Sequence, residues 1–214
     1  MTTDRVSFTS RINFVNAETF EKFRRGAYID FRPENSVSNK KNAILPWFKK
    51  YLRHDVVKAD EFYTDEVRTC SAGGVVNLKT GKCAGFHFFD SIDNATETDK
   101  MLEAIFGLVP NPDRALILGG KRLSFANYSL PIFEDILQGL KAKIKNVTIF
   151  REHLFPYSES DLHYSLKDDT WTIHSMFRDS TDLVHNKEVK NQETLKKYFN
   201  EIEIADGDSL NFIC

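Results

Sequence analysis

The sequence predicts a mixed domain of the α/β or α+β class, in which strands outnumber helices and two main helices cover a sheet. Many short segments alternate apolar and polar residues or are continuously apolar, which is typical of strands. Two longer segments repeat apolar residues every three or four positions, which indicates amphipathic helices. The 214 residues are 41% hydrophobic and 28% charged, an ordinary globular composition that is ample for a core.

The N-terminal part of the chain predicts short elements around a polar loop. Gly26 should end the first helix, because glycine favours the position after a helix C-terminus. The expected elements are a strand over 6–14, a helix over 17–25, a strand over 27–31, a loop over 32–42, and a helix opened by Pro46 with Trp47, Phe48, Tyr51 and Leu52 on its apolar side.

The rest of the chain predicts alternating strands and helices. The turn at 79–81 separates two strands, and a second hairpin surrounds Asp168 and Asp169. The expected order is strand 74–78, strand 82–89, a helix capped by Thr96, strand 115–118, a helix capped by Ser129, strand 146–150, hairpin strands 162–166 and 171–176, helix 192–200 and strand 201–205.

Charge and cysteine usage narrow the function classes. The net charge is −2, so no basic balance indicates nucleic acid as a partner. No apolar stretch approaches the length of a membrane span, and Asp4 and Arg5 interrupt any secretory signal. Cys70, Cys83 and Cys214 are too few for a disulfide framework and fit a reducing compartment. We therefore expect a cytoplasmic protein, or one delivered into a host cytosol without a cleavable signal.

Cys70 is the first candidate for chemistry. Small residues follow it in Cys70-Ser71-Ala72-Gly73-Gly74, which leaves room for a substrate and for amide donors to an oxyanion. Arg68 lies two residues away and could favour a thiolate.

His87 is the second candidate, because it is a polar residue on an otherwise apolar strand. A cysteine and a histidine on adjacent strands form the smallest unit for nucleophilic acyl chemistry. The alternative stays open at this point: buried cysteines are usually inert packing, and a histidine in an apolar strand is often a satisfied core residue. Cys83 is expected to be a packing residue.

Two further patterns predict structure rather than chemistry. Gly119-Gly120-Lys121 lacks the spacing of a phosphate-binding loop and predicts a turn at the end of a strand. His153, His163 and His174 lack a completing carboxylate or cysteine, so we expect surface or edge residues and no metal site.

The spacing of Cys70 and His87 resembles that of the CheD chemoreceptor glutamine deamidases. Those proteins have a nucleophilic cysteine, a strand–turn–strand, and then a Gly-small-apolar-His stretch that Gly85-Phe86-His87 fits. Thr64 lies six residues before Cys70, where that family has its third catalytic residue. The order of elements from residue 60 to 176 also agrees. The sequence departs from the family at Arg68-Thr69, which replace Gly-Ser, and at Phe89-Asp90, which replace Leu-Pro.

The resemblance implies a CheD-like sandwich and a Cys70–His87–Thr64 centre that needs no metal or cofactor. The activity implied is deamidation of a glutamine side chain on a protein substrate. Oxyanion or substrate-contacting residues would be Ser71, Ala72, Gly119, Gly120 and Asn127. If the centre is catalytic, a ring nitrogen of His87 should lie within ~4 Å of the Cys70 sulfur.

Residues 1–58 have no counterpart in that family, so we expect an N-terminal extension packed on a core domain over 59–214. The Cys-His core is also similar to that of the toxin deamidases of the cytotoxic necrotizing factor type, and an effector-like deamidase would accommodate the extra segment. Two alternatives remain: a non-catalytic protein-interaction module on the same fold, and a transglutaminase-like amine transferase.

Overall fold

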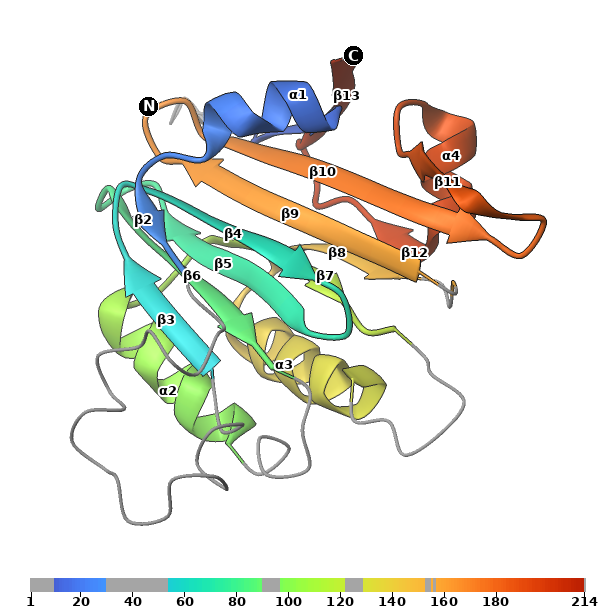
Figure 1. The fold of residues 1–214 in the computed structure, drawn as a ribbon. Coiled ribbons are helices and arrows are strands. Elements are labelled where there is room, and N and C mark those ends of the chain that lie inside the picture. The colour runs from blue at the N-terminus through green and yellow to red at the C-terminus, as the bar shows by residue number, and fades with distance from the viewer. Residues whose placement is uncertain are drawn as a thin grey trace, which may run out of the picture.

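Two β-sheets stack face to face in the computed structural model, and two helices cover the outer face of one of them (Figure 1). The structure describes residues 10–29, 54–89, 97–121, 129–152, 155 and 157–213. The predicted fold class is confirmed, because the architecture is a mixed α+β sandwich.

The seven-stranded sheet has the strand order β13-β1-β10-β9-β4-β2, and β11 pairs with the far part of β10. Strand β1 lies between β10 and β13 and runs parallel to both, so the two ends of the described chain meet in one sheet. The strands are β1 (Arg11–Val15), β2 (Ala27–Tyr28), β4 (Glu61–Val67), β9 (Tyr157–Ser165), β10 (Thr170–Asp179), β11 (Asp182–Glu188) and β13 (Ser209–Ile213).

The six-stranded sheet has the strand order β12-β8-β7-β5-β6-β3. Its central strands are antiparallel except for the parallel pair β7 and β8. The strands are β3 (His54–Lys58), β5 (Ser71–Asn77), β6 (Lys82–Phe88), β7 (Arg114–Gly119), β8 (Asn146–Glu152) and β12 (Phe199–Glu203).

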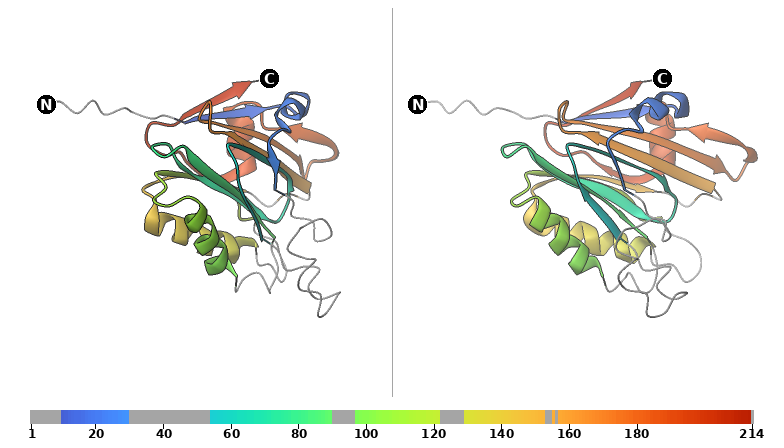
Figure 2. Two further views of the ribbon diagram at one scale, coloured as in Figure 1. Left: turned by 90° about the vertical axis from the view of Figure 1, so that its left-hand side faces the viewer. Right: turned by 60° about the vertical axis from the view of Figure 1, so that its left-hand side comes forward.

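Helices α2 (Thr98–Leu108) and α3 (Ser129–Lys143) pack against the outer face of the six-stranded sheet (Figure 2). Both bury the apolar stripe that their sequences predict, because the residues recur at helical spacing and face the sheet. The buried side chains of the stripes are Met101, Leu102 and Ile105 in α2, and Ile132, Phe133, Ile136, Leu137 and Leu140 in α3.

The short helices lie at the other sheet and at the C-terminal end. Helix α1 (Ala17–Phe20) continues into the 3₁₀ helix η1 (Glu21–Phe23), and Gly26 follows with a φ of 86°. Helix α4 (Gln192–Tyr198) begins at an Asn191 capping box. Within the described part of the chain, no helix is both long and apolar enough to cross a membrane.

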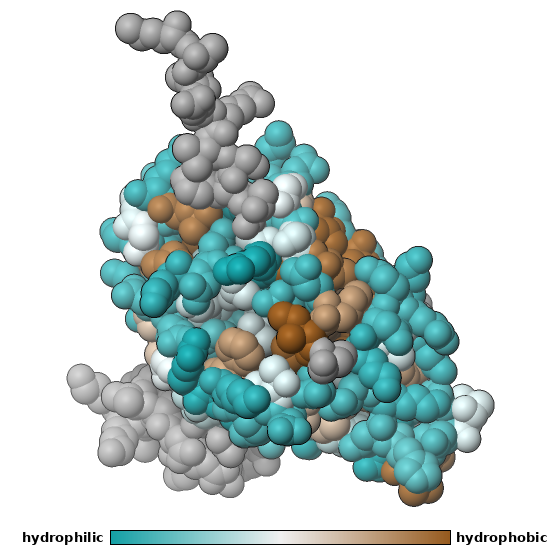
Figure 3. All heavy atoms as spheres, turned by 90° about the horizontal axis from the view of Figure 1, so that it is seen from above, coloured by the Kyte–Doolittle hydropathy of each residue, from teal (hydrophilic) through white to brown (hydrophobic). Residues whose placement is uncertain are grey.

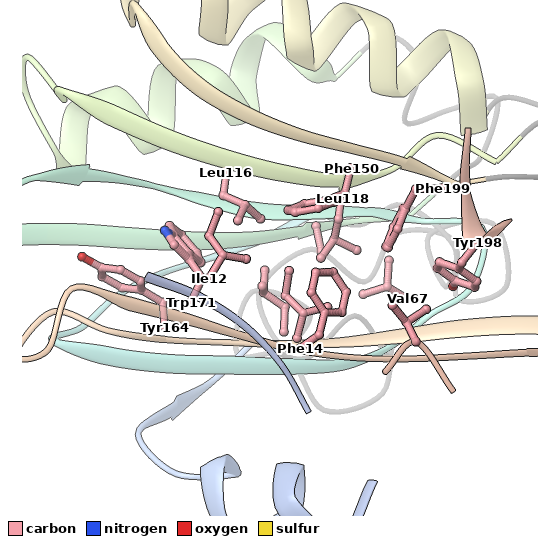
Figure 4. Close-up of a cluster of buried hydrophobic side chains, with 14 of the residues drawn as sticks. Ile12, Phe14, Val67, Leu116, Leu118, Phe150, Tyr164, Trp171, Tyr198 and Phe199 are labelled. Carbon is pink, nitrogen blue, oxygen red and sulfur yellow. The ribbon is translucent and has the colours of Figure 1, made fainter. Parts of the chain in front are cut away.

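The main core fills the space between the two sheets with aromatic side chains. Phe14 packs edge-on against Phe150, and Tyr164 lies 4.2 Å from Trp171 between ring centroids. Val67, Tyr198 and Phe199 lie together towards one end of this layer (Figure 4). Phenylalanine rings therefore fill much of the inter-sheet layer, and further buried phenylalanines lie in the helix layer.

The outer side that carries α1 is mostly hydrophilic, with scattered hydrophobic residues (Figure 3). Among the residues that the structure describes, the large apolar side chains that stand exposed are Leu183, Val184 and Ile213. The two internal layers thus contain most of the apolar surface.

Within the described residues the expected strands and helices are found with shifted ends. The two expected caps are wrong, because Glu97 is the N-cap of α2 and Ser129 is the first residue of α3. The structure also adds strands that the patterns did not predict. These are β3, β4, β11 and β13. The helix expected after Pro46 lies outside the described residues. The described part of residues 1–58 supplies β1, β2 and β3, which pair within both sheets. A domain boundary at residue 58 stays a prediction.

Candidate active site

Cys70 lies where the chain crosses from one sheet to the other. Strand β4 of the seven-stranded sheet ends at Val67, and β5 of the six-stranded sheet begins at Ser71. The Cys70 side chain belongs to the inter-sheet core, and the residue is only 3% exposed. The thiol is therefore placed at the end of the layer between the sheets.

His87 occupies the neighbouring strand on the same side of the sheet. It pairs with Ala72 across β5 and β6, and Ala72 shares the inter-sheet core with Cys70. Since side chains alternate along a strand, residues 70, 72 and 87 face the same layer. The sequence expectation that Cys70 and His87 share one face agrees with this arrangement. Their separation of ~4 Å stays a prediction.

Thr64 reaches the histidine from the facing sheet. Its Oγ1 atom lies 2.6 Å from Nδ1 of His87, and both residues are fully buried. The same hydroxyl donates to the backbone carbonyl of Ile29 at 3.0 Å. The structure thus brings together two of the three residues that the sequence singled out, although 23 positions separate them.

The two hydrogen bonds of Thr64 determine the tautomer of His87. A hydroxyl has one hydrogen, and Thr64 directs it to Ile29. Its oxygen must then accept a hydrogen bond from Nδ1–H of His87. In the neutral ring, Nε2 is therefore the nitrogen that carries the lone pair and can take up a proton.

Burial keeps this imidazole neutral. Desolvation lowers the pKa of His87 to about 3, because the charged ring would lose its hydration between the sheets. The side chain therefore acts as a proton acceptor only when a nearby anion, such as the thiolate that proton transfer from Cys70 would leave, or a change of surroundings offsets that penalty.

Cys83 behaves as the packing residue that the sequence predicted. Its residue is 1% exposed, and Sγ donates to the carbonyl of Ala59 at 2.7 Å. Burial, with a smaller contribution from Asp60, raises the pKa of its thiol to about 12. This cysteine should be inert near neutral pH.

Arg68 is poorly placed to favour a thiolate. Its side chain is 53% exposed, and Nε forms an ion pair with Oε2 of Glu159 at 2.9 Å. Tyr157 donates a second hydrogen bond to the same carboxylate oxygen. The guanidinium charge is therefore offset by its own partner and is screened by water.

The other expected site residues fall into two groups. Ser71 and Ala72 are buried in β5, and Ser71 pairs with Phe88, so its side chain faces the helix layer rather than Cys70. Gly119 ends β7 with a φ of 128°, and a Cβ there would collide with the carbonyl oxygen of Cys70. Gly120 follows it. Asn127 lies outside the described residues, and the roles of all five residues stay predictions.

His163 and His174 were expected at the surface but are buried instead, which corrects that expectation, while His153 lies outside the described residues. Helix α1 and η1 cover them: Phe20 lies against His174, and Phe23 lies against His163. His174 Nδ1 is 2.9 Å from Asp161 Oδ2, and its Nε2 is 3.3 Å from Glu188. Because these carboxylates lie against opposite ring nitrogens, they do not converge on one point. Among the described residues no group of three His, Cys, Asp or Glu could hold a metal.

A buried ionic cluster that the sequence patterns did not predict lies near the same end of the sandwich. Lys121 and Glu152 are both nearly inaccessible, with Nζ 3.5 Å from Oε2. Ser160 donates to the other oxygen of Glu152 at 3.0 Å and lies 3.0 Å from the Tyr198 hydroxyl. The sequence signal for this cluster was the lysine directly after Gly119-Gly120, which we interpreted only as part of a turn.

Comparison with known proteins adds a loose structural similarity. The sequence matches no protein-family model, and it has no significant match among the curated proteins. The solved C-terminal domain of CNFy from Yersinia pseudotuberculosis is similar with a TM-score of 0.33 and 12% identity. The alignment covers 64% of this chain and 59% of that one, so the chain spans less than two thirds of this neighbour. The similarity is loose and shows no activity for this chain, and the resemblance to CheD stays a prediction.

Proposed function

We propose that the protein is a cysteine-dependent amidohydrolase that deamidates a glutamine side chain of a protein substrate. Cys70 is the nucleophile, His87 the general base and acid, and Thr64 the residue that orients the histidine. The observation that carries the proposal is the buried 2.6 Å contact between Thr64 and His87, which joins the two sheets on the layer that Cys70 faces.

The reaction follows from the tautomer that Thr64 selects. Nε2 of His87 accepts the thiol proton as the Cys70 sulfur attacks the carboxamide carbon of glutamine. Collapse of the tetrahedral intermediate breaks the C–N bond, and the imidazolium gives its proton to the departing ammonia. Water then loses a proton to the same nitrogen while it attacks the thioester. The products are glutamate and the restored thiol.

The proposed mechanism also needs hydrogen-bond donors for the developing oxyanion. The close approach of Gly119 to the Cys70 carbonyl brings two strand ends together without side-chain atoms between them. Amide donors at such a position stabilise negative charge more strongly than they would in water. In the proposed mechanism the amides of residues 70–72 fill this role.

The described state is closed around the reacting groups. Cys70 is 3% exposed and His87 is inaccessible, so a glutamine side chain can reach the sulfur only after neighbouring segments move. Binding of the correct protein would drive that opening, and this would restrict the reaction to substrates that supply enough binding energy.

The first test is alkylation of the purified protein with iodoacetamide near neutral pH, followed by peptide mass mapping. Cys70 should react selectively, and Cys83 should stay unmodified until the protein is unfolded. Equal protection of both cysteines over the whole pH range would contradict a nucleophilic role for Cys70.

The second test is product analysis with a mixture of glutamine-containing peptides and folded proteins. Ammonia release and conversion of glutamine to glutamate should require Cys70 and should vanish in Cys70→Ala. Addition of methylamine separates deamidation from amine transfer, because a transglutaminase would attach the amine to the substrate.

The burial of the centre favours one other candidate function, a non-catalytic interaction module. On that alternative Cys70 and His87 are packing residues, and the Thr64–His87 bond only ties the sheets together. The alkylation test separates the two: an interaction module predicts a thiol as inert as that of Cys83.

A further inference from the structure

Four neighbouring strands bring a row of ionisable groups to one end of the six-stranded sheet. In strand order these are His87 on β6, Cys70 before β5, Lys121 after β7 and Glu152 on β8. The pairing of Ala72 with Leu118 sets residue 70 level with residue 120. The pairing of Gly119 with Arg151 sets residue 120 level with Glu152. The lysine therefore lies between the cysteine and the glutamate in the sheet.

Two glycines direct Lys121 into the layer between the sheets. Gly119 and Gly120 have φ values of 128° and 71°, so the strand alternation ends there. A Cβ on Gly120 would point at the ring of Phe133 in the helix layer. The next side chain lies on the other side: Nζ of Lys121 donates to the carbonyl of Ser158 at 3.2 Å in the facing sheet.

Cys70 and Lys121 consequently lie at the same end of the inter-sheet layer. Ser160, two residues from the carbonyl that binds Lys121, pairs with Val67, three residues before Cys70. Val67 and Tyr198 mark this end of the core in Figure 4. Adjacent strands of a sheet lie about 4.8 Å apart. Lys121 follows β7, the strand next to the one that Cys70 precedes, and Glu152 lies on β8, one strand further away.

We propose that Lys121 is a further residue of this site, and that its ammonium group stabilises the Cys70 thiolate. The inference rests on the proposed role of Cys70 as the nucleophile. A buried cation acts through a medium of low dielectric, so it favours a nearby anion even without a direct contact. Lys121 is 3% exposed, whereas the alternative cation, Arg68, is largely exposed and paired with Glu159.

Glu152 is the positioning residue for this cation. Its Oε2 atom is 3.5 Å from Nζ of Lys121, and its Oε1 atom accepts from Ser160. Ser160 in turn contacts Ser175 at 2.8 Å and Tyr198 at 3.0 Å. Desolvation, the largest influence, raises the pKa of the Glu152 carboxyl, and the charge of Lys121 opposes that rise. The charge of Lys121 thus favours the ionised form of Glu152, and the carboxylate in turn holds the ammonium group in position.

The test compares two variants that differ only in the cation. Glu152→Gln keeps Lys121 and removes the negative charge, while the double variant Lys121→Met, Glu152→Gln removes both charges without leaving an unpaired buried carboxylate. The rate of Cys70 alkylation is measured against pH from 5 to 10 by peptide mass mapping. A pH-independent opening of the site changes the rate but leaves the midpoint of this profile in place.

We expect the double variant to have a midpoint about one pH unit above that of Glu152→Gln, and about tenfold slower alkylation at pH 7. Glu152→Gln alone should lower the midpoint relative to wild type, because the cation then has no competing anion. Lys121→Arg should keep the wild-type midpoint. A purely structural role of the cluster would instead move both Glu152→Gln and the double variant in the same direction.

Cys83 serves as the folding control, because its alkylation reports unfolding of either variant. Identical midpoints in Glu152→Gln and the double variant would overturn the role of Lys121 while leaving the proposed function intact. A wild-type midpoint at the ordinary thiol value of about 8.5 would contradict the proposed function itself.

Discussion

At the scale of single residues, Thr64 is the link between the fold and the proposed chemistry. It belongs to the seven-stranded sheet, while His87 belongs to the six-stranded sheet, so their hydrogen bond exists only when the sandwich is assembled. The bond to Ile29 uses the only hydroxyl hydrogen, which makes the role of Thr64 that of an acceptor. A residue that cannot accept from Nδ1–H should leave the imidazole without a fixed tautomer.

Thr64→Val is therefore expected to reduce the rate of deamidation by about 10²-fold, because misorientation of a catalytic group has an effect of that order. Thr64→Ser should retain most of the activity, since it keeps the hydroxyl. Cys70→Ala should remove activity entirely. Ammonia release at saturating substrate is the measurement, and unchanged kinetics in Thr64→Val would exclude Thr64 from the mechanism.

Gly119 is the second residue whose identity the structure explains. Its φ of 128° is outside the range that other residues adopt readily, and a side chain would meet the carbonyl oxygen of Cys70. The site therefore needs glycine here to bring β7 against the start of β5.

Gly119→Ala should lower the free energy of unfolding by about 2–3 kcal/mol, through backbone strain and displacement of residue 70. Gly107→Ala is the matched control, because Gly107 lies in α2 and a Cβ there meets nothing within 4 Å. That control should stabilise the protein by about 0.5–1 kcal/mol. Urea unfolding checks both values, and equal effects would contradict the close approach.

At the scale of elements, the sequence patterns predicted the strands and helices that bury a regular face. Helix α3 and strands β5 to β7 have continuous or periodic apolar residues, so burial and pattern agree. Strand β4 was missed because its burial pattern breaks after Thr64: the pairing with β9 shifts before Val67, and Glu66 has a φ of 55°. A bulge of this kind leaves no regular alternation to recognise.

The sequence could likewise relate only some residues of the candidate site to one another. Cys70 and His87 could be related by their position on two consecutive strands, because hairpin pairing is local. Lys121 and Glu152 could not, since their contact depends on the order of strands in the sheet and on the turn at Gly119 and Gly120. Pairs that only the sheet order creates leave no spacing in the sequence.

The bulge in β4 places a residue other than glycine in a strained backbone conformation. Glu66 holds a left-handed backbone conformation, and its N–H donates to Oδ1 of Asp161 at 3.0 Å. A residue with a Cβ is disfavoured in this conformation by roughly 1–2 kcal/mol relative to glycine.

Glu66→Gly should therefore be about 1 kcal/mol more stable than Glu66→Ala, because both remove the carboxylate and only alanine keeps the strain. The two variants are compared by urea unfolding at neutral pH. If they unfold at the same concentration, the bulge is not held in the left-handed conformation in solution.

At the scale of the whole molecule, the described part of residues 1–58 contributes strands to both sheets. Strand β1 lies inside the seven-stranded sheet, and β3 pairs with β6, the strand that carries His87. Removal of residues 1–58 would therefore take paired strands from both layers. Its effect on activity would report loss of the sandwich, so substrate specificity of this segment must be tested by substitutions rather than by deletion.

His87 makes the stability of the sandwich depend on pH. Its imidazole is enclosed between the sheets, and burial holds its pKa at about 3, below the value of about 6.5 for an exposed histidine. The folded state therefore binds fewer protons than the unfolded chain between these values. The contribution of His87 to stability is complete above pH 6.5 and declines as the pH falls, by up to about 1.4 kcal/mol per pH unit.

Wild-type protein should accordingly lose about 1.5–2 kcal/mol more free energy of unfolding than His87→Gln between pH 6.5 and pH 5, because glutamine does not titrate. Other groups titrate in both proteins, so the difference between the two curves isolates the histidine. Urea unfolding followed by far-ultraviolet circular dichroism at several pH values gives both curves. Parallel curves would mean that His87 is reached by water and protonated in the folded state, which would contradict its enclosure between the sheets.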